Sequence, residues 1–271
     1  MKKLIFPLVI AAISAATLLS CAKNGATPAA AAKTFVIVPG AWSAPYAWDN
    51  VKASLEKNGN KVVVVQLPGH GSDQTPPQNL TIDVYRDKVI STIDSVGGKV
   101  ILVGHSLGGV IISEVAEKVP SQIEKLVYVA AFVPLTGQSL FDLASTDTTS
   151  VLGANLRPSA DNLTVDIVHD QIINGFIADG TTDEQNLLLA NYRVEPFIPL
   201  TNKVTLTTAN YGSVPKVYIK TLLDHAVTPT LQKRMLAATP AFTNIYQINT
   251  GHCPFLVKAD SLSILLTNSA K

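Results

Sequence analysis

A serine between glycines near the middle of the chain has the surroundings of a catalytic nucleophile. The segment Gly-His-Ser-Leu-Gly fills residues 104–108, directly after the apolar run 100–103 and before the largely apolar segment 110–116. Between a strand and a helix, this spacing forms a sharp turn that lifts the serine hydroxyl above the sheet. Without that context it would indicate only a glycine-rich turn. The context predicts that Ser106 is a nucleophile.

A serine hydroxyl needs a neighbouring base, and His252 is the histidine in the expected place. It follows the last predicted strand and precedes the final helix, which is where triads in the chain order Ser, Asp, His carry their base. Among the other histidines, His105 lies inside the serine turn with its side chain directed away from the nucleophile's face, and His169 lies in a long insertion between two predicted strands. His70 follows the second strand, where it could line a pocket or be structural.

The acid that orients the base is predicted to be Asp224. It closes the strand 217–221, between Ser106 and His252 in the chain. Because loops at the carboxyl ends of neighbouring parallel strands meet at one edge of a sheet, these residues can converge there. The alternative is that Asp224 is a turn or capping residue ahead of residues 228–229.

Attack on a carbonyl also requires hydrogen-bond donors for the oxyanion that forms. The N–H of Leu107 is one donor by the geometry of the turn. The second is expected from the loop after the first strand, residues 38–42, where Gly40 lets the backbone approach the substrate.

The elements that must position these residues alternate between strands and helices. Predicted strands cover residues 34–38, 61–66, 99–103, 125–129, 217–221 and 243–248. Predicted helices cover about 47–58, 82–96, 107–118, 229–238 and 257–267. Apolar runs such as 62–65 suit strands that are covered on both faces. The repeated βαβ order predicts one α/β domain over residues 34–271, with a mostly parallel sheet flanked by helices.

One long interval interrupts this alternation. About eighty residues separate the strand that ends near Val133 from the one that begins near Val217, too many for an ordinary loop. We expect an inserted helical cap at about 135–212. Its helices are predicted near Leu140, over 165–176 and over 183–192. Its apolar side chains favour a small hydrophobic acyl or alcohol group, although most of them are expected to pack the cap on the core.

The first residues have the outline of an export signal. Lys2 and Lys3 precede the apolar stretch 4–19, and Leu-Leu-Ser-Cys at residues 18–21 resembles the lipobox of bacterial lipoproteins. Residues 1–20 are therefore predicted to be a signal peptide of the lipoprotein type, with Cys21 as the lipidated residue.

The segment after the signal has the composition of a tether. Residues 21–33 are rich in alanine and without periodicity, as in a flexible linker. This predicts a protein that is exported and anchored through a lipid in the bacterial cell envelope, at the outer membrane or the periplasmic face. The alternative is cleavage near Ala16, with Cys21 lost or left as a free thiol.

Composition limits the classes of partner. With 271 residues, 47% hydrophobic and 15% charged, the chain can bury one large core, and its formal net charge of +1 argues against a nucleic-acid partner. The sequence has no metal-ligand cluster, phosphate loop or dinucleotide fingerprint, so we expect no metal and no cofactor. With Cys21 lipidated, Cys253 would have no cysteine to pair with. No oligomeric state is predicted.

Over the whole domain the sequence resembles the α/β-hydrolase group that includes plant methylesterases, hydroxynitrile lyases and small bacterial esterases. The matching segments are residues 35–42 with Trp48, 103–109, 217–229 and 251–255. The resemblance implies an α/β-hydrolase fold and agrees on the triad Ser106, Asp224 and His252. It places the second oxyanion donor at Ala41 and brings Gly40, Trp42 and His105 to the substrate site.

The departures from this group bear on the type of reaction. Pro39 stands where many relatives have histidine, and Gly251 where many have aspartate. Gly40 and Cys253 replace the threonine and the lysine that hydroxynitrile lyases use, which favours ester hydrolysis. Cys253 is expected to be an ordinary residue at the pocket edge.

The sequence therefore predicts a carboxylesterase-type hydrolase that acts on a small-molecule ester through an acyl-enzyme. Two alternatives remain: a cofactor-free lyase or C–C hydrolase of the same fold, and a ligand-binding protein that retains the triad.

Overall fold

The computed structural model describes Met1, residues 32–239 and residues 242–271. Apart from Met1, the predicted signal peptide lies outside these ranges, as do Cys21 and most of the predicted linker 21–33. None of the helices within these ranges has the length and apolar character needed to span a membrane.

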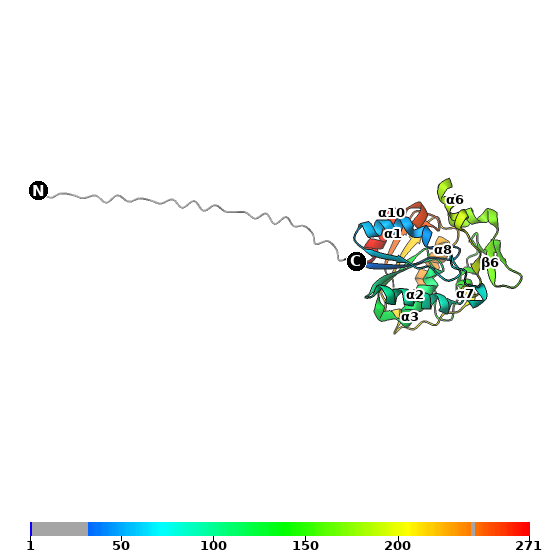
Figure 1. Ribbon diagram of the computed structural model, residues 1–271, viewed down its shortest axis with the longest axis horizontal. Coiled ribbons are helices and arrows are strands. Elements are labelled where there is room, and N and C mark those ends of the chain that lie inside the picture. Colours follow the sequence, from blue (N-terminus) through cyan, green and yellow to red (C-terminus); the bar gives the residue numbers. More distant parts are fainter. Residues whose placement is uncertain (2–31, 240–241) are drawn as a thin grey trace. The chain divides into compact units, whose positions relative to one another are not determined.

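Six parallel strands form the central sheet (Figure 1). They are β1 (Thr34–Val38), β2 (Lys61–Val64), β3 (Val100–His105), β4 (Ile123–Val129), β8 (Lys216–Thr221) and β9 (Phe242–Ile248), in the spatial order β2-β1-β3-β4-β8-β9. Every adjacent pair runs parallel. The six predicted strands are confirmed, with ends that differ by at most two residues.

Helices cover both faces of this sheet (Figure 1). On one face lie α1 (Asp49–Lys57), α9 (Pro254–Val257) and α10 (Ala259–Ser269), and on the other α2 (Ile82–Val96), α3 (Gly108–Lys118) and α8 (Pro229–Ala238). Along β1, Phe35 and Ile37 pack into the first core while Val36 and Val38 pack into the second. Because successive side chains of a strand point to opposite faces, an uninterrupted apolar strand supplies both cores.

Local sequence signals set the ends of two helices. The hydroxyl of Thr81 accepts the N–H of Val84 at the start of α2, and Thr228 caps α8 in the same way, with Pro229 in the first turn. Both helices have the predicted bounds. The predicted helix 257–267 is instead divided in two at Lys258, whose φ of −139° is not helical.

The insertion between β4 and β8 is a mixed cap. It holds α4 (Leu140–Ala144), β5 (Leu156–Pro158), β6 (Thr164–Ile167), α5 (Ile172–Phe176), α6 (Thr182–Asn191), β7 (Glu195–Pro196) and α7 (Ile198–Thr201). The helices near Leu140 and over 183–192 are confirmed. The helix over 165–176 was wrong in its first part, because burial there alternates with period two and β6 pairs antiparallel with β5 and β7.

Short 3-10 turns complete the connections. They lie at Pro45–Trp48, Pro77–Asn79, Pro120–Gln122, Gly153–Asn155, His169–Gln171 and Tyr211–Ser213.

The strand order reverses at β1. Its successor β2 lies on one side and β3 on the other. The loops after β1 and β3 therefore leave the same edge in opposite directions, which is the position at which open α/β sheets bind their ligands. The predicted nucleophile and the predicted oxyanion loop belong to these two loops.

Candidate active site

The turn after β3 holds Ser106 in a strained conformation. Its φ is +51°, in a region of backbone conformation that residues other than glycine seldom adopt. A Cβ on Gly104 would lie 2.5 Å from the carbonyl oxygen of Gly108, and one on Gly108 would lie 2.4 Å from that of Val38. Both glycines are therefore needed for the turn to form, as the motif predicts.

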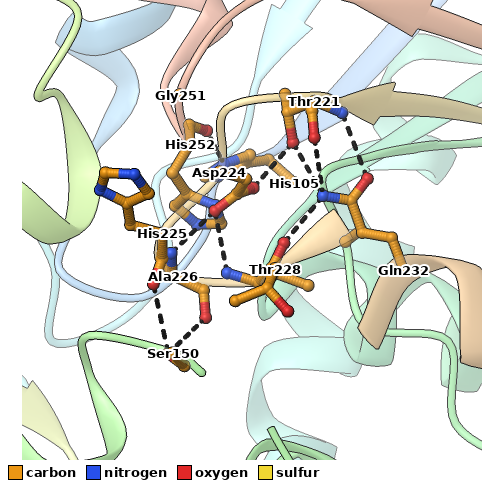
Figure 2. A network of polar contacts seen from close by, with 12 residues as sticks. His105, Ser150, Thr221, Asp224, His225, Ala226, Thr228, Gln232, Gly251 and His252 are labelled. Carbon is orange, nitrogen blue, oxygen red and sulfur yellow. Dashed lines mark hydrogen bonds and ion pairs between the residues drawn. The ribbon is translucent and has the colours of Figure 1, made fainter. Parts of the chain in front are cut away.

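His252 and Asp224 form a buried pair. The ring nitrogen Nδ1 of His252 lies 2.8 Å from Oδ2 of Asp224, which also accepts the hydroxyl of Thr221 at 2.7 Å (Figure 2). The other carboxylate oxygen accepts the N–H groups of Ala226 and Val227, at 2.8 and 2.9 Å. Four donors thus fix the carboxylate. In the tautomer in which Nδ1 donates to Asp224, Nε2 is free to accept a hydrogen bond.

A residue that the sequence did not single out, Gln232, lies beside the loop of Asp224 and bonds to it (Figure 2). It is fully buried in α8. Its side-chain oxygen accepts the N–H of Thr221 at 3.2 Å, and its nitrogen donates to the carbonyl oxygen of Val227 at 2.7 Å. Its only signal in the sequence is a place beside Leu231 and Met235 on the apolar face of the helix.

The loop after β1 packs directly on the serine turn. A Cβ on Gly40 would lie 2.7 Å from Cβ of Ser106 and 2.7 Å from Nδ1 of His105, so Gly40 allows the two loops to touch. Within the described ranges, the N–H groups of Ala41 and Leu107 make no hydrogen bond. Two donors are thus free beside Ser106, as an oxyanion hole requires.

His105 lies beneath the loop of His252. Its Nε2 donates to the carbonyl oxygen of His252 at 2.9 Å, and the two rings are 4.5 Å apart. Burial holds the pKa of His105 well below its usual value, so the ring is neutral. Its neighbour in a narrow cavity is Cys253, and burial raises the pKa of that thiol well above its usual value. Cys253 is thus an unreactive thiol.

A cavity of about 400 Å³ reaches Ser106 from beneath the cap. Trp42 forms part of its wall, and Leu140, Leu152 and Leu200 of the cap supply apolar surface. The volume lies in the range of small-molecule sites.

Comparison with known proteins identifies the family of the chain. A model of the "Alpha/beta hydrolase family" matches residues 35–261. The chain belongs to the α/β hydrolase family. Among the curated relatives of this chain, "Putative methylesterase 11, chloroplastic" of Arabidopsis thaliana is 31% identical over 253 residues. The alignment covers 88% of this chain, which spans only 64% of the length of that relative.

Solved structures share the fold. Polyneuridine aldehyde esterase superposes with a TM-score of 0.80 at 21% identity, covering 89% of this chain and all of that one. An extracellular α/β-hydrolase from a Paenibacillus species, which shares structural and functional homology with tobacco salicylic acid binding protein 2, gives 0.76 at 25% identity and covers 88% and 98% of the two chains.

In this family member the cap holds three loops of the candidate site through carboxylates. Each carboxylate accepts a backbone N–H of one loop. The bonds run from Trp42 to Glu195 (2.7 Å), from Thr228 to Asp147 (3.0 Å) and from Gly251 to Asp179 (2.8 Å). The placement of the cap and the alignment of these three loops are therefore coupled.

The contact with Asp179 accounts for one departure from the relatives. A Cβ on Gly251 would lie 2.6 Å from Oδ1 of Asp179. The cap carboxylate thus occupies the space that a side chain at position 251 would take.

Side chains that can ligate a metal are scattered rather than clustered. Nowhere in the part of the chain that the structure describes do three His, Cys, Asp or Glu side chains gather as a metal site requires.

Proposed function

We propose that the chain is a serine esterase, with Ser106 as nucleophile, His252 as base and Asp224 as the residue that orients the base. The observation that carries the proposal is the buried Asp224–His252 pair at the edge of the sheet where the turn of Ser106 meets an apolar cavity. The curated relative named as a putative methylesterase also supports an ester as the bond that is cleaved.

The reaction proceeds in two steps. Nε2 of His252 takes the proton of the Ser106 hydroxyl as its oxygen attacks the ester carbonyl, and then gives it to the departing alcohol. The N–H groups of Ala41 and Leu107 stabilise the oxyanion. Water, activated by the same histidine, then hydrolyses the acyl-enzyme and releases the acid.

Small hydrophobic esters are the proposed substrates. The cavity of about 400 Å³ has room for a compact acyl or alcohol group, and its wall is mainly apolar, with Phe132 and Leu156 beside the leucines already named. Ser145 and Thr148 add a few polar atoms to the wall.

The test is hydrolysis of a chain-length series of p-nitrophenyl esters by the purified domain, with Ser106→Ala alongside. Rapid turnover that is lost in the variant supports the proposal, and the preferred chain length measures the acyl pocket. Full activity of Ser106→Ala rejects the assignment of the nucleophile.

The two alternatives predict different results. A folded wild type that cleaves cyanohydrins or diketones and no ester is a lyase or C–C hydrolase. One that turns esters over slowly and holds the product tightly is a ligand-binding protein.

We also propose that the protein is exported and lipid-anchored through Cys21, on the strength of the lysines at 2 and 3, the apolar stretch 4–19 and the lipobox-like residues 18–21. In bacteria that express the full chain, radiolabelled palmitate should enter the wild type and fail to enter Cys21→Ser. Equal labelling of the two rejects the modification at this residue.

A further inference from the structure

One buried charged pair belongs to neither the triad nor the pocket wall. Glu195 of β7 is fully buried, and its carboxylate lies 3.0 Å from Nε2 of His70, in the loop after β2. The same carboxylate accepts the backbone N–H of Trp42 at 2.7 Å. Since burying a carboxylate is unfavourable unless it is paired and hydrogen-bonded, this arrangement calls for an explanation.

The surroundings of His70 favour its protonated form. Its Nδ1 lies 3.0 Å from the carbonyl oxygen of Pro68 while its Nε2 faces Glu195, so both ring nitrogens point at acceptors. Burial alone would lower the pKa of His70, but the charge and hydrogen bond of Glu195 outweigh it and the pKa is raised. The charge of Arg193 opposes the rise, and Tyr85 packs edge-on against the ring.

The peptide that Glu195 holds is strained. Trp42 has a φ of +55°, which is unfavourable for a bulky residue and persists only where the surroundings impose it. Two contacts impose it here: the N–H bond to Glu195 and a bond of 3.2 Å from the indole Nε1 to the carbonyl oxygen of Val165. Both partners belong to the cap sheet.

The same peptide bond joins Trp42 to Ala41. With the N–H of Trp42 bound to Glu195, the donor that this turn leaves for the substrate is the N–H of Ala41. The N–H of Ala41 itself belongs to the preceding Gly40–Ala41 peptide. Loss of the bond to Glu195 would release the Ala41–Trp42 peptide, and with it the loop conformation that orients the N–H of Ala41.

We propose that Glu195, held in place by His70, is a positioning residue that keeps the N–H of Ala41 directed at the oxyanion. The inference rests on the proposed esterase function. It makes the cap a part of the oxyanion hole, although no cap atom need touch the reacting carbonyl.

Two substitutions separate positioning from mere packing. Glu195→Leu removes both acceptor atoms. Glu195→Gln keeps both hydrogen bonds possible. Its amide oxygen can accept the N–H of Trp42, and its amide nitrogen can donate to Nε2 of a neutral His70. Asp183→Leu, at an exposed carboxylate of the cap, is the matched control.

The measurement is kcat and KM for a p-nitrophenyl ester, per active site titrated with a fluorophosphonate. Loss of one oxyanion donor lowers kcat about 10²- to 10³-fold, so a misdirected donor should lower it roughly 10- to 100-fold in Glu195→Leu, with KM nearly unchanged. Glu195→Gln should recover most of this loss, and Asp183→Leu should match the wild type. An unchanged kcat per titrated site in Glu195→Leu overturns the inference.

Amide hydrogen exchange of residues 39–44 tests the anchoring without turnover. Exchange should be faster in Glu195→Leu than in the wild type and in Glu195→Gln, and equal rates in all three overturn the inference. A wild type that hydrolyses no ester rejects the esterase proposal and the oxyanion role with it, while the exchange rates still decide whether Glu195 anchors the loop. If Glu195→Leu fails to fold, Glu195→Ser, whose side chain is too short to reach Trp42, replaces it in both measurements.

Discussion

Replacing Asp224 by asparagine should prevent His252 from acting as the base without disturbing the fold. The two N–H groups of Ala226 and Val227 donate to Oδ1, so the amide oxygen of an asparagine must take that position. Its NH2 group then takes the place of Oδ2, 2.8 Å from Nδ1 of His252, and donates where an acceptor stood. The histidine can satisfy this donor only by moving its proton to Nε2, the nitrogen that must be free to accept the proton of Ser106.

The expected loss is large because no other described group restores the tautomer. In serine proteases the equivalent change lowers kcat about 10⁴-fold, which corresponds to about 5 kcal/mol of transition-state stabilisation. The assay is kcat for a p-nitrophenyl ester, with thermal unfolding to confirm the fold and Asp260→Asn, at an exposed carboxylate, as control. A variant that keeps kcat within tenfold of the wild type would refute the assignment of Asp224 and the reasoning from its four donors.

Two further predictions concern buried polar residues. Gln232→Leu leaves the N–H of Thr221 and the carbonyl of Val227 without their partner, so at about 1–3 kcal/mol for each group the free energy of unfolding should fall by roughly 2–6 kcal/mol. Denaturant unfolding measures it, with the exposed Lys233→Leu as control, and a change below about 1 kcal/mol contradicts the role given to Gln232. His70 should titrate by NMR with a midpoint above 6.5, because Glu195 raises its pKa. Its contribution to stability is then complete below about pH 6.5 and is lost as the pH rises through the raised pKa; a midpoint at or below 6.5 would show that the ring is not held as a cation.

The core of this fold was predictable because its signals are local. The strands are short apolar runs, the bounds of α2 and α8 follow from Thr81 and Thr228, and the serine turn is a contiguous motif that glycines make possible. The pairing of Asp224 with His252 followed from their positions after neighbouring strands, and the structure brings them to 2.8 Å.

The cap was less predictable because its structure depends on distant partners. Val165–Ile167 lie in a strand only because β5 and β7 pair with it, and a helix is equally consistent with their apolar spacing. The hydrogen bond between Trp42 and Glu195 spans 153 positions of the chain, and no local sequence pattern near either residue predicts it. The role of Gln232 was not predictable for a similar reason, because its partners Thr221 and Val227 lie in a strand and a loop outside its own helix.

The direction of β1 also matters for any use of this protein on a solid support. The strand begins at Thr34 and ends at Val38, next to the edge that carries the proposed triad, so the chain enters the domain at the opposite edge of the sheet. Five residues of strand separate the two edges by about 16 Å. Coupling to a bead or electrode through Lys33 therefore leaves the edge that carries the proposed triad turned away from the surface, whereas random coupling through lysines would orient the domain in many ways.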